Sequence, residues 1–543
     1  MRGDAAVAEV LRREGVEYLF CFPHNTLIDA ASAAGIRPIM PRTERTLLNM
    51  ADGYSRVSNG RRLGVCTVQA GPGIENAFAG IAHAYADSVP LLVLPGQAAR
   101  DRLGLPPNFD AVENYRGVTK WAATIHGPDR VPAMLRRAFS LLRSGRGAPV
   151  LLELPADVAA GELVSTDFDY TPPQRVRPSA DPEAIRQAAR ALCEAELPVL
   201  HAGQGVLWSE AGPELAALAE AAGAPVVTTL AGKSAMAEDH PLAAGYVGYT
   251  GALPAYDLLR EADLVFGVGT SFSRSLLSAP LPPGKRVLQL TIDERDLNKE
   301  YALEVGIQGD AKLALTALVE EVRRLGGGRT GAQQRGADVT GRREAWLARW
   351  APKRTSDEVP INPYRVIEDL INVADRRRTI VTHDSGNPRD QLAPFWPALF
   401  PRGYVGWGKS TQLGYSMGLI MGAKLAAPEK LCVNVMGDAA FGMAGLELET
   451  AARMRIPILT IVLNNSAMGN YEKNMPVATE RYGLKYLSGN YAKVADGLGV
   501  FSQRVTEPAD IVPALRRAIE AVEGGEPALV EMITREEGAF SRP

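Results

Sequence analysis

The stretch VMGDAAFGMAGLELETAARMRIPILTIVLNNSAMG, residues 435–469, places polar residues directly after two apolar runs. The apolar runs 431–436 and 457–463 predict two strands, and AGLELETAARMR (444–455) between them predicts one helix. In a parallel strand–helix–strand unit, the turns that follow both strands lie at the same edge of the sheet. Asp438 and Asn465 are therefore expected to face one pocket, although 27 positions separate them.

The same alternation runs through the whole chain of 543 residues. Two polar, Pro-, Gly- and Arg-rich stretches, 171–182 and 326–343, predict linkers, the second of them flexible. The predicted fold class is α/β, with three doubly wound parallel-sheet domains at residues 1–165, 180–325 and 358–543. The apolar runs that predict their strands are 16–22, 36–40, 63–69, 89–94, 197–206, 224–230, 262–269, 285–293, 379–384, 431–438, 457–465 and 527–534.

Composition narrows the class of protein. Hydrophobic residues make up 46% and charged residues 22% of the chain, and the formal net charge is −3. These values favour a globular protein with no nucleic-acid partner and no membrane association. The four cysteines are far apart and form no CxxC pair, which favours a reducing cytoplasm over a disulfide framework or a zinc site.

Asp438 and Asn465 also point to a chemistry. A carboxylate and an amide oxygen are hard ligands that suit Mg²⁺, which usually completes its octahedron with water and phosphate oxygens. Gly437, Ala439 and Ala440 are small enough to let a phosphate approach the backbone, and the helix that follows adds favourable partial charge. The alternative is a simple turn with a helix cap, and the Gly-Asp pair alone does not decide between the two.

A longer pattern does decide. Met421-Gly422, Pro428, Val433, Val435, Gly437 to Ala440 and the double asparagine stand at the spacing of the thiamine diphosphate signature. The whole chain resembles the acetolactate synthase-like group of thiamine diphosphate enzymes. The resemblance implies that Asp438 and Asn465 are Mg²⁺ ligands and that the main-chain carbonyl of Ala467 is the third protein ligand. It also implies that residues 1–165 bind the pyrimidine of the cofactor and 358–543 its diphosphate.

The resemblance locates the activating glutamate in PRTERTLLNMADGYSR, where Glu44 follows a strand and precedes a helix. In the family this carboxyl group hydrogen-bonds N1′ of the aminopyrimidine. Such a group must give and take a proton, which burial favours by raising its pKa. The alternative for Glu44 is a surface residue.

Further positions match cofactor contacts of the family. Gln97 falls near the substrate. Leu413 falls where an apolar side chain bends the cofactor, and the alternative for Leu413 is a residue of the core. Because opposite ends of the cofactor bind different blocks, the resemblance implies a site between two chains, with a homodimer at minimum and a homotetramer expected. The remaining cofactor positions implied in this way are Gly73, Ser385, Gly386, Asn387, Thr411, Met468 and Gly469.

Three departures bear on the reaction. His24 and Asn25 replace residues of a glycine-rich turn, and each could contact substrate or simply pack. Glu472 follows the metal loop. A carboxylate there would repel an anionic 2-oxo acid, but it could act as the base that a lyase needs to deprotonate a 2-hydroxyl group. The alternative for Glu472 is an exposed residue at a helix end. The motif FGMAGLELET (441–450) is similar to the corresponding motif of oxalyl-CoA decarboxylases and 2-hydroxyacyl-CoA lyases.

These departures make a 2-hydroxyacyl-CoA lyase-like carbon–carbon lyase the leading interpretation. The alternative is an acetolactate synthase-like carboligase or a 2-oxo acid decarboxylase; a non-catalytic paralogue is a third. The lyase reading implies a CoA or ADP moiety in the central domain, with Asp293 for a ribose and Arg274 for a phosphate. FAD is doubtful, because Gly269-Thr270-Ser271-Phe272 lacks the arginine of the family's flavin motif.

Overall fold

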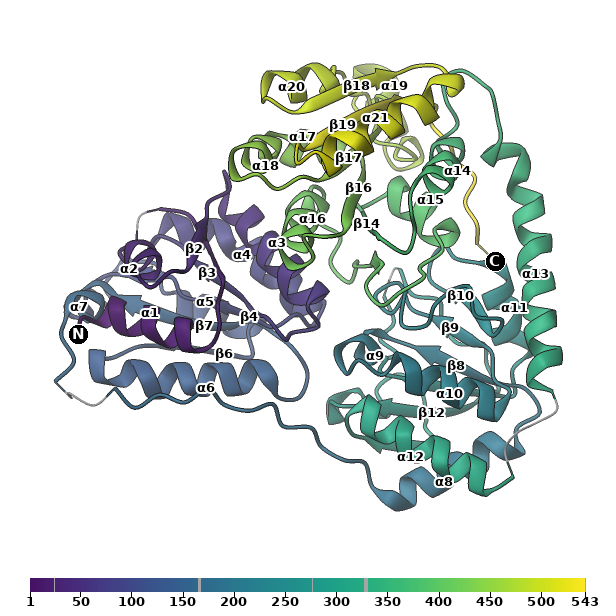
Figure 1. Ribbon diagram of the computed structural model, residues 1–543, viewed down its shortest axis with the longest axis horizontal. Coiled ribbons are helices and arrows are strands. Elements are labelled where there is room, and N and C mark those ends of the chain that lie inside the picture. The colour runs from purple at the N-terminus through teal and green to yellow at the C-terminus, as the bar shows by residue number, and fades with distance from the viewer. Residues whose placement is uncertain (24, 165–167, 276, 327–330, 543) are drawn as a thin grey trace.

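The computed structural model describes residues 1–23, 25–164, 168–275, 277–326 and 331–542. The described chain forms three α/β units, each built on a sheet whose strands are all parallel. Figure 1 shows the N-terminal unit on the left, the C-terminal unit at the top and the central unit at the lower right. The predicted fold class is confirmed.

The N-terminal unit carries a seven-stranded sheet in the order β2-β1-β3-β4-β7-β5, with β6 paired to β7. The central strands β1, β3, β4 and β7 are buried and largely apolar, and helices cover the sheet on both sides. The strands are β1 (Tyr18–Cys21), β2 (Arg37–Ile39), β3 (Gly64–Thr67), β4 (Leu91–Val93), β5 (Gly96–Gln97), β6 (Trp121–Thr124) and β7 (Val150–Pro155). The helices are α1 (Gly3–Arg13), α2 (Leu27–Ala33), α3 (Glu44–Val57), α4 (Pro72–Ala86), α5 (Ala111–Tyr115), α6 (Val131–Arg143) and α7 (Ala156–Ala160).

The central unit has a six-stranded sheet in the order β10-β9-β8-β11-β12-β13. An irregular segment over 171–181 connects it to the first unit and crosses the bottom of Figure 1 to reach α8. The strands are β8 (Pro198–Ala202), β9 (Val226–Thr228), β10 (Ala243–Tyr246), β11 (Leu264–Val268), β12 (Arg286–Thr291) and β13 (Val305–Gln308). The helices are α8 (Pro182–Glu194), α9 (Gln204–Trp208), α10 (Gly212–Ala222), α11 (Leu253–Glu261) and α12 (Ala311–Arg324).

The C-terminal unit has the sheet order β15-β14-β16-β17-β19-β18. Its apolar strands β16 and β17 pair in parallel, with Gly437 opposite Leu463. The strands are β14 (Thr379–His383), β15 (Tyr404–Val405), β16 (Leu431–Gly437), β17 (Leu459–Asn464), β18 (Phe501–Val505) and β19 (Ala528–Ile533). The helices are α14 (Pro363–Val373), α15 (Asn387–Phe395), α16 (Tyr415–Ala426), α17 (Asp438–Ala444), α18 (Leu448–Met454), α19 (Pro476–Tyr482), α20 (Tyr491–Gly497) and α21 (Ile511–Glu523).

Two local predictions were wrong. Most of the expected flexible linker 326–343 belongs to α13 (Ala332–Arg354), which runs along the right edge of Figure 1. Tertiary packing stabilises this helix despite its glycines, because buried Trp346 stacks on Phe395 at 4.9 Å between ring centroids. The single helix expected over 444–455 is instead α17, a 3₁₀ turn at Gly445–Glu447 and α18, since Ala444 leaves helical geometry at φ −137°.

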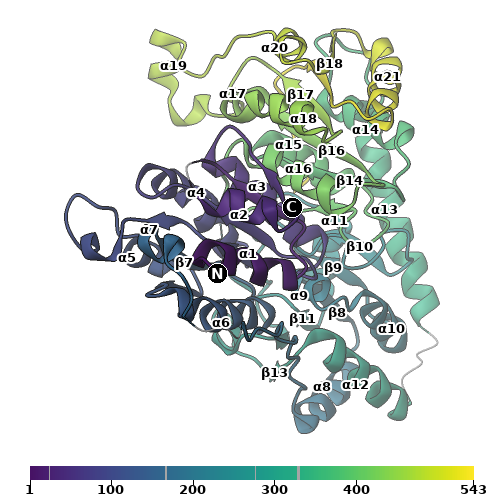
Figure 2. The same ribbon diagram turned by 60° about the vertical axis from the view of Figure 1, so that its left-hand side comes forward.

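The N- and C-terminal units are joined by a close helix–helix contact between α3 and α16. A Cβ atom at Gly53 would lie 2.0 Å from the Leu419 carbonyl oxygen, and one at Gly422 would lie 1.9 Å from that of Met50. Only glycine allows this approach. Figure 2 shows the two helices stacked at the boundary between the units.

A buried charge cluster lies beside this contact. Arg56 on α3 donates to Asp52 at 2.7 Å and to Asp87 at 3.2 Å, and Tyr415 on α16 donates to Asp52. Gln204 of the central unit also donates to the Asp87 carbonyl at 2.6 Å. The Lys409 N–H of the C-terminal unit donates to Asp87 Oδ1 at 3.2 Å, so all three units meet at Asp87. No described helix is long and apolar enough to span a bilayer.

Candidate functional site

The metal-ligand candidates lie where β16 and β17 end. Asp438 is the first residue of α17 and is buried, while Asn465 begins the loop after β17. Backbone N–H groups of Ser466 and Ala467 face the Asp438 carboxylate. The structure thus brings the two turns of the predicted strand–helix–strand unit together at one edge of the sheet.

The oxygen atoms at this edge fit a divalent cation. Asp438 Oδ1 accepts from the Ala439 N–H at 2.8 Å, whereas the buried Oδ2 has no hydrogen-bond partner among the described residues. Asn465 Oδ1 accepts from the Ala467 N–H at 3.0 Å and keeps a second lone pair. Burial raises the pKa of Asp438, and neighbouring backbone N–H groups partly oppose this rise. A bound cation would stabilise the charged carboxylate further.

The donor set itself discriminates between metals. No group of three or more His, Cys, Asp or Glu side chains that could hold a metal occurs in the described part of the chain. One carboxylate, one amide oxygen and a carbonyl instead match Mg²⁺, which retains water and phosphate ligands. The Mg²⁺ role of Asp438, Asn465 and Ala467 fits these observations and stays a prediction.

A third turn, between β14 and α15, converges on the same place. Gly386 adopts a left-handed φ of +84°, and the buried Ser385 hydroxyl has no hydrogen-bond partner among the described residues. A Cβ at Gly469 would lie 2.4 Å from Asn387 Nδ2, so the loop after Asn465 touches the start of α15. Helix N-termini and an unpaired hydroxyl suit an anion such as a diphosphate.

Buried Asp384 fixes this cradle to α16. Its carboxylate accepts from the N–H groups of Ser385 at 2.8 Å and Gly414 at 3.0 Å. Among the predicted residues nearby, Thr411 is exposed and Leu413 is half-buried against the apolar cluster of the N- and C-terminal units. Of the remaining predicted residues, Gly437, Ala439 and Ala440 lie at the start of α17, and Met468 lies in the loop after β17.

The predicted residues of the N-terminal unit follow the carboxyl ends of its strands. Glu44, after β2, is the first residue of α3 and is 8% exposed, and the Thr43 side chain caps that helix. Gly73, after β3, is buried in the first turn of α4. Asn25 follows β1, Gln97 ends β5, and His24 lies outside the described residues.

Asn25 and Gln97 are held by the fold. Asn25 donates to Thr67 Oγ1 at 2.9 Å and accepts from the Leu27 N–H at 2.9 Å. Gln97 Nε2 donates to Glu153 Oε1 at 2.7 Å and to the Phe109 carbonyl at 3.0 Å. Sequence reasoning missed Glu153, a buried acid within the apolar strand β7, and burial raises the pKa of its carboxyl group. An acid inside the run VLLELP was the available signal.

Glu472 is where the structure is most informative about the reaction. Its side chain is 63% exposed and its Oε2 lies 2.7 Å from the ammonium of Lys485. The Lys485 side chain itself is buried, and carboxylates on both sides raise its pKa. The negative charge of Glu472 is therefore offset by a neighbouring positive charge.

The motif FGMAGLELET also has a packing role. Buried Glu447 accepts from the Arg42 N–H at 3.0 Å, from Thr43 Oγ1 at 3.2 Å and from Thr450 Oγ1 at 2.9 Å. The motif thereby ties the C-terminal unit to the residues before Glu44. In the described chain, no hydrogen bond or ion pair joins the predicted residues of the N-terminal unit to those of the C-terminal cradle.

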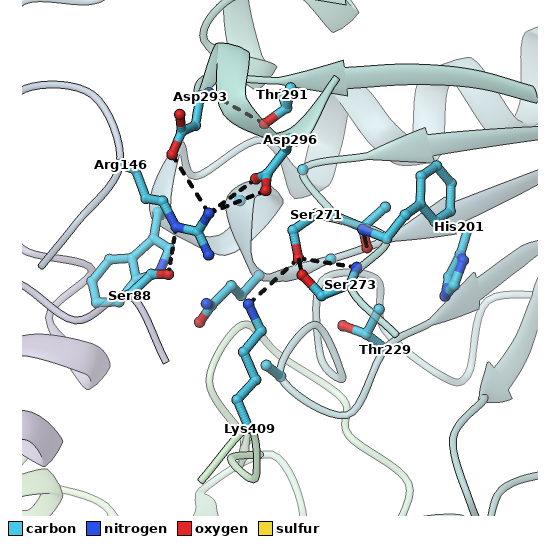
Figure 3. A pocket seen from close by; sticks show the side chains of 18 of the residues that line it. Ser88, Arg146, His201, Thr229, Ser271, Ser273, Thr291, Asp293, Asp296 and Lys409 are labelled. Carbon is cyan, nitrogen blue, oxygen red and sulfur yellow. Dashed lines mark hydrogen bonds and ion pairs between the residues drawn. The ribbon is translucent and has the colours of Figure 1, made fainter. Parts of the chain in front are cut away.

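A separate cavity of about 200 Å³ opens at the carboxyl end of the central sheet, with walls from all three units (Figure 3). Lys409 reaches into it toward Ser271, with 3.4 Å between Nζ and Oγ. Both ring nitrogens of His201 lack partners within the described residues, and burial lowers its pKa to about 4.

The two nucleotide contacts expected in this cavity differ in availability. Arg274 lines the cavity. Asp293 is already occupied, because Arg295 donates to both of its oxygens at 2.9 and 2.7 Å and Arg146 approaches at 3.5 Å. Gly203 serves close packing, since a Cβ there would lie 2.4 Å from the Gly269 carbonyl oxygen.

Comparison with known proteins places these features in context. Residues 1–119, 185–318 and 384–532 match, in turn, the thiamine pyrophosphate enzyme N-terminal TPP binding domain, central domain and C-terminal TPP binding domain. A probable acetolactate synthase large subunit of Methanocaldococcus jannaschii is 30% identical, covering 98% of this chain and 92% of its own. Glyoxylate carboligase of Escherichia coli O157:H7 is 31% identical, covering 95% and 90%. Acetolactate synthase isozyme 3 large subunit of Escherichia coli K12 is 29% identical, covering 98% and 94%.

Proposed function

Because this chain belongs to the thiamine pyrophosphate enzyme family and is a thiamine diphosphate-dependent enzyme, we propose that it is a carboligase for 2-oxo acids. In such a reaction one 2-oxo acid loses CO₂, and its acyl carbon forms a new bond to the carbonyl carbon of a second molecule. Uptake of one proton gives a 2-hydroxy-3-oxo acid. The names of the relatives, acetolactate synthase and glyoxylate carboligase, favour this reaction over a CoA-dependent lyase.

The ion pair between Glu472 and Lys485, with 2.7 Å between Oε2 and Nζ, is the observation that favours a carboligase over a lyase. A bare carboxylate near the substrate would disfavour an anionic 2-oxo acid, and this is one of the departures that favour a lyase. Since Lys485 offsets that charge, the objection no longer holds. The packing role of Glu447 likewise accounts for the lyase-like motif without a CoA substrate.

Each residue of the cradle has a defined task. Asp438, Asn465 and the Ala467 carbonyl would hold Mg²⁺, and the turns at 385–387 and 437–440 would hold the diphosphate. The Glu44 carboxyl group, buried at the start of α3, would exchange a proton with N1′ of the aminopyrimidine. Thiamine diphosphate, when bound, supplies a nucleophilic carbon that adds to the carbonyl group of a 2-oxo acid.

The test is to offer the protein, with thiamine diphosphate and Mg²⁺, pyruvate and glyoxylate separately and 2-hydroxyacyl-CoA thioesters in parallel. Mass spectrometry should find CO₂ and a 2-hydroxy-3-oxo acid from an oxo acid, and both should be lost in Glu44→Gln. Cleavage of a thioester with the oxo acids untouched would establish the lyase instead. A C2 hydrogen–deuterium exchange rate no faster than that of unbound cofactor would favour a non-catalytic paralogue.

We also propose that the working unit is a homodimer or a larger homo-oligomer. Apolar side chains on α4 and around α17 support this, because Phe78, Met443 and Leu446 are 42%, 55% and 60% exposed in the single chain. Light scattering during size-exclusion chromatography should give at least twice the mass of one chain. A monomer that turns over substrate would contradict the proposal.

The central cavity is proposed to bind an adenine nucleotide or the ADP moiety of CoA. Lys409 and Arg274 supply positive charge for phosphate groups, whereas a ribose would have to displace Arg295 from Asp293. Calorimetric titration with ADP should detect binding that weakens in Arg274→Ala. Visible flavin absorbance in the purified protein would instead assign the cavity to FAD.

A further inference from the structure

The C-terminal segment after β19 returns to the loop that carries the metal-ligand candidates. The Thr534 N–H donates to the Asn464 carbonyl at 2.9 Å, directly before Asn465. Two residues later, Glu536 Oε1 accepts from the Asn470 N–H at 2.7 Å. The segment therefore contacts both ends of the loop 465–470.

Glu536 makes a second contact on the other side of this loop. Its Oε2 accepts from Lys485 Nζ at 3.2 Å, and Lys485 also pairs with Glu472. The Lys485 carbonyl accepts from the Met468 N–H at 2.8 Å. The Glu536 carboxylate therefore contacts the loop 465–470 in two ways. It accepts directly from Asn470, and it also binds Lys485, whose backbone carbonyl accepts from Met468.

Asn470 links Glu536 to the turn at 385–387, which is proposed to hold the diphosphate. Its backbone is left-handed, with φ at +66°, and its Nδ2 donates to Asn387 Oδ1 at 3.1 Å. Asn387 is the first residue of α15, and a Cβ at Gly469 would lie 2.4 Å from its Nδ2. A chain of contacts therefore runs from Glu536 through Asn470 to Asn387.

We propose that Glu536 is a positioning residue for the cofactor cradle, acting on the metal loop and on Asn387 through Asn470. The inference rests on the proposed function in that the cradle binds thiamine diphosphate and Mg²⁺. Glu536 would not contact either group. It would set the geometry of the residues that do, and such supporting contacts typically change metal affinity 10- to 100-fold.

The structure also provides a mutation that separates positioning from folding. In Glu536→Ala, Lys485 keeps its partner Glu472 at 2.7 Å, so no buried ammonium is left without a carboxylate. In Glu536→Gln, the amide oxygen can still accept from the Asn470 N–H. Asn470→Gly removes only the side-chain bond to Asn387, and glycine tolerates the left-handed backbone at this position.

The experiment is calorimetric titration of the full-length protein with thiamine diphosphate at saturating Mg²⁺, followed by Mg²⁺ titration at saturating cofactor. We expect Glu536→Ala and Asn470→Gly to raise the Kd for both about 10-fold, and Glu536→Gln to stay within about 3-fold of wild type. Arg535→Ala is the matched control, because its ion pair with Glu358 is exposed and the variant should bind like wild type.

Equal affinities of wild type and Glu536→Ala would overturn this proposal alone, and so would equal weakening in Arg535→Ala. Failure of the wild-type protein to bind the cofactor would overturn both this proposal and the proposed function. Thermal unfolding of each variant, compared with wild type, guards against a global loss of structure. Should Glu536→Ala fail to fold, Asn470→Gly decides the matter by the same titrations.

Discussion

The carboxylate of Glu472 lies 2.7 Å from the ammonium of Lys485, thirteen positions further along the chain. Glu472 is exposed and Lys485 is buried, so the lysine is held in place by the fold and the glutamate closes over it from the solvent side. Because the Glu472 carboxylate is this exposed, solvent screens much of its charge.

Glu472→Gln should therefore change kcat/KM for a 2-oxo acid by no more than about 3-fold. A general base in a lyase would instead cost about 10²- to 10⁴-fold. Steady-state kinetics with the best oxo acid measure the effect, with the exposed Glu480→Gln as the control in the same segment. A loss of about 100-fold would return Glu472 to the reaction itself.

Removal of the metal tests the oxygen cradle. Chelation should release thiamine diphosphate, and added Mg²⁺ should restore its binding, because the proposed ion would be held by both the protein and the diphosphate. Asp438→Asn removes the buried charge and should raise the Kd for Mg²⁺ at least about 10-fold. The control is Asp496→Asn, an exposed change on α20. Unchanged Mg²⁺ affinity in Asp438→Asn would exclude Asp438 as a ligand.

The α3–α16 contact predicts a large stability cost for one added methyl group. Gly422→Ala places a Cβ within 1.9 Å of the Met50 carbonyl oxygen, so the helices must separate. We expect a loss of about 1–3 kcal/mol or more in the free energy of unfolding. Gly341→Ala on α13 faces open space and should stabilise by about 0.5–1 kcal/mol. Urea denaturation measures both, and equal effects would contradict the packing argument.

Buried His201 predicts acid sensitivity. Burial lowers its pKa from 6.5 to about 4, so the unfolded chain binds a proton at pH 5 and the native chain does not. The contribution of neutral His201 to the free energy of unfolding is therefore complete above pH 6.5 and is lost as the pH decreases toward 4. The loss is about 2 kcal/mol at pH 5. His201→Phe should reduce the difference between unfolding free energies at pH 7 and pH 5.

Exposed His126→Gln is the control for this titration and should leave the pH dependence unchanged. Urea unfolding at both pH values gives the required free energies. An identical pH dependence in wild type and His201→Phe would show that His201 does not remain neutral in the native state.

The pattern of residues was sufficient for the fold class and for the edge at which Asp438 and Asn465 meet. Both depend on short apolar runs whose length and alternation are local properties, and the parallel connection then fixes where the strand ends lie. The sequence likewise located Glu44 at the start of a helix, because Thr43 supplies a local cap. The linker that composition predicted over 326–343 was wrong at α13, whose buried face is defined by Trp346 and its distant partner Phe395.

Only the tertiary structure decided what the charged residues do. The partners of Glu447 are Arg42 and Thr43, 405 and 404 positions away, and Glu472 and Glu536 share one lysine from different segments. No local periodicity encodes such pairs, because each joins segments that lie far apart in the sequence and meet only through tertiary packing. The sequence by itself therefore determined where the chemistry lies, and the packing of distant segments determined which charges are offset and which oxygen atoms remain available for a ligand.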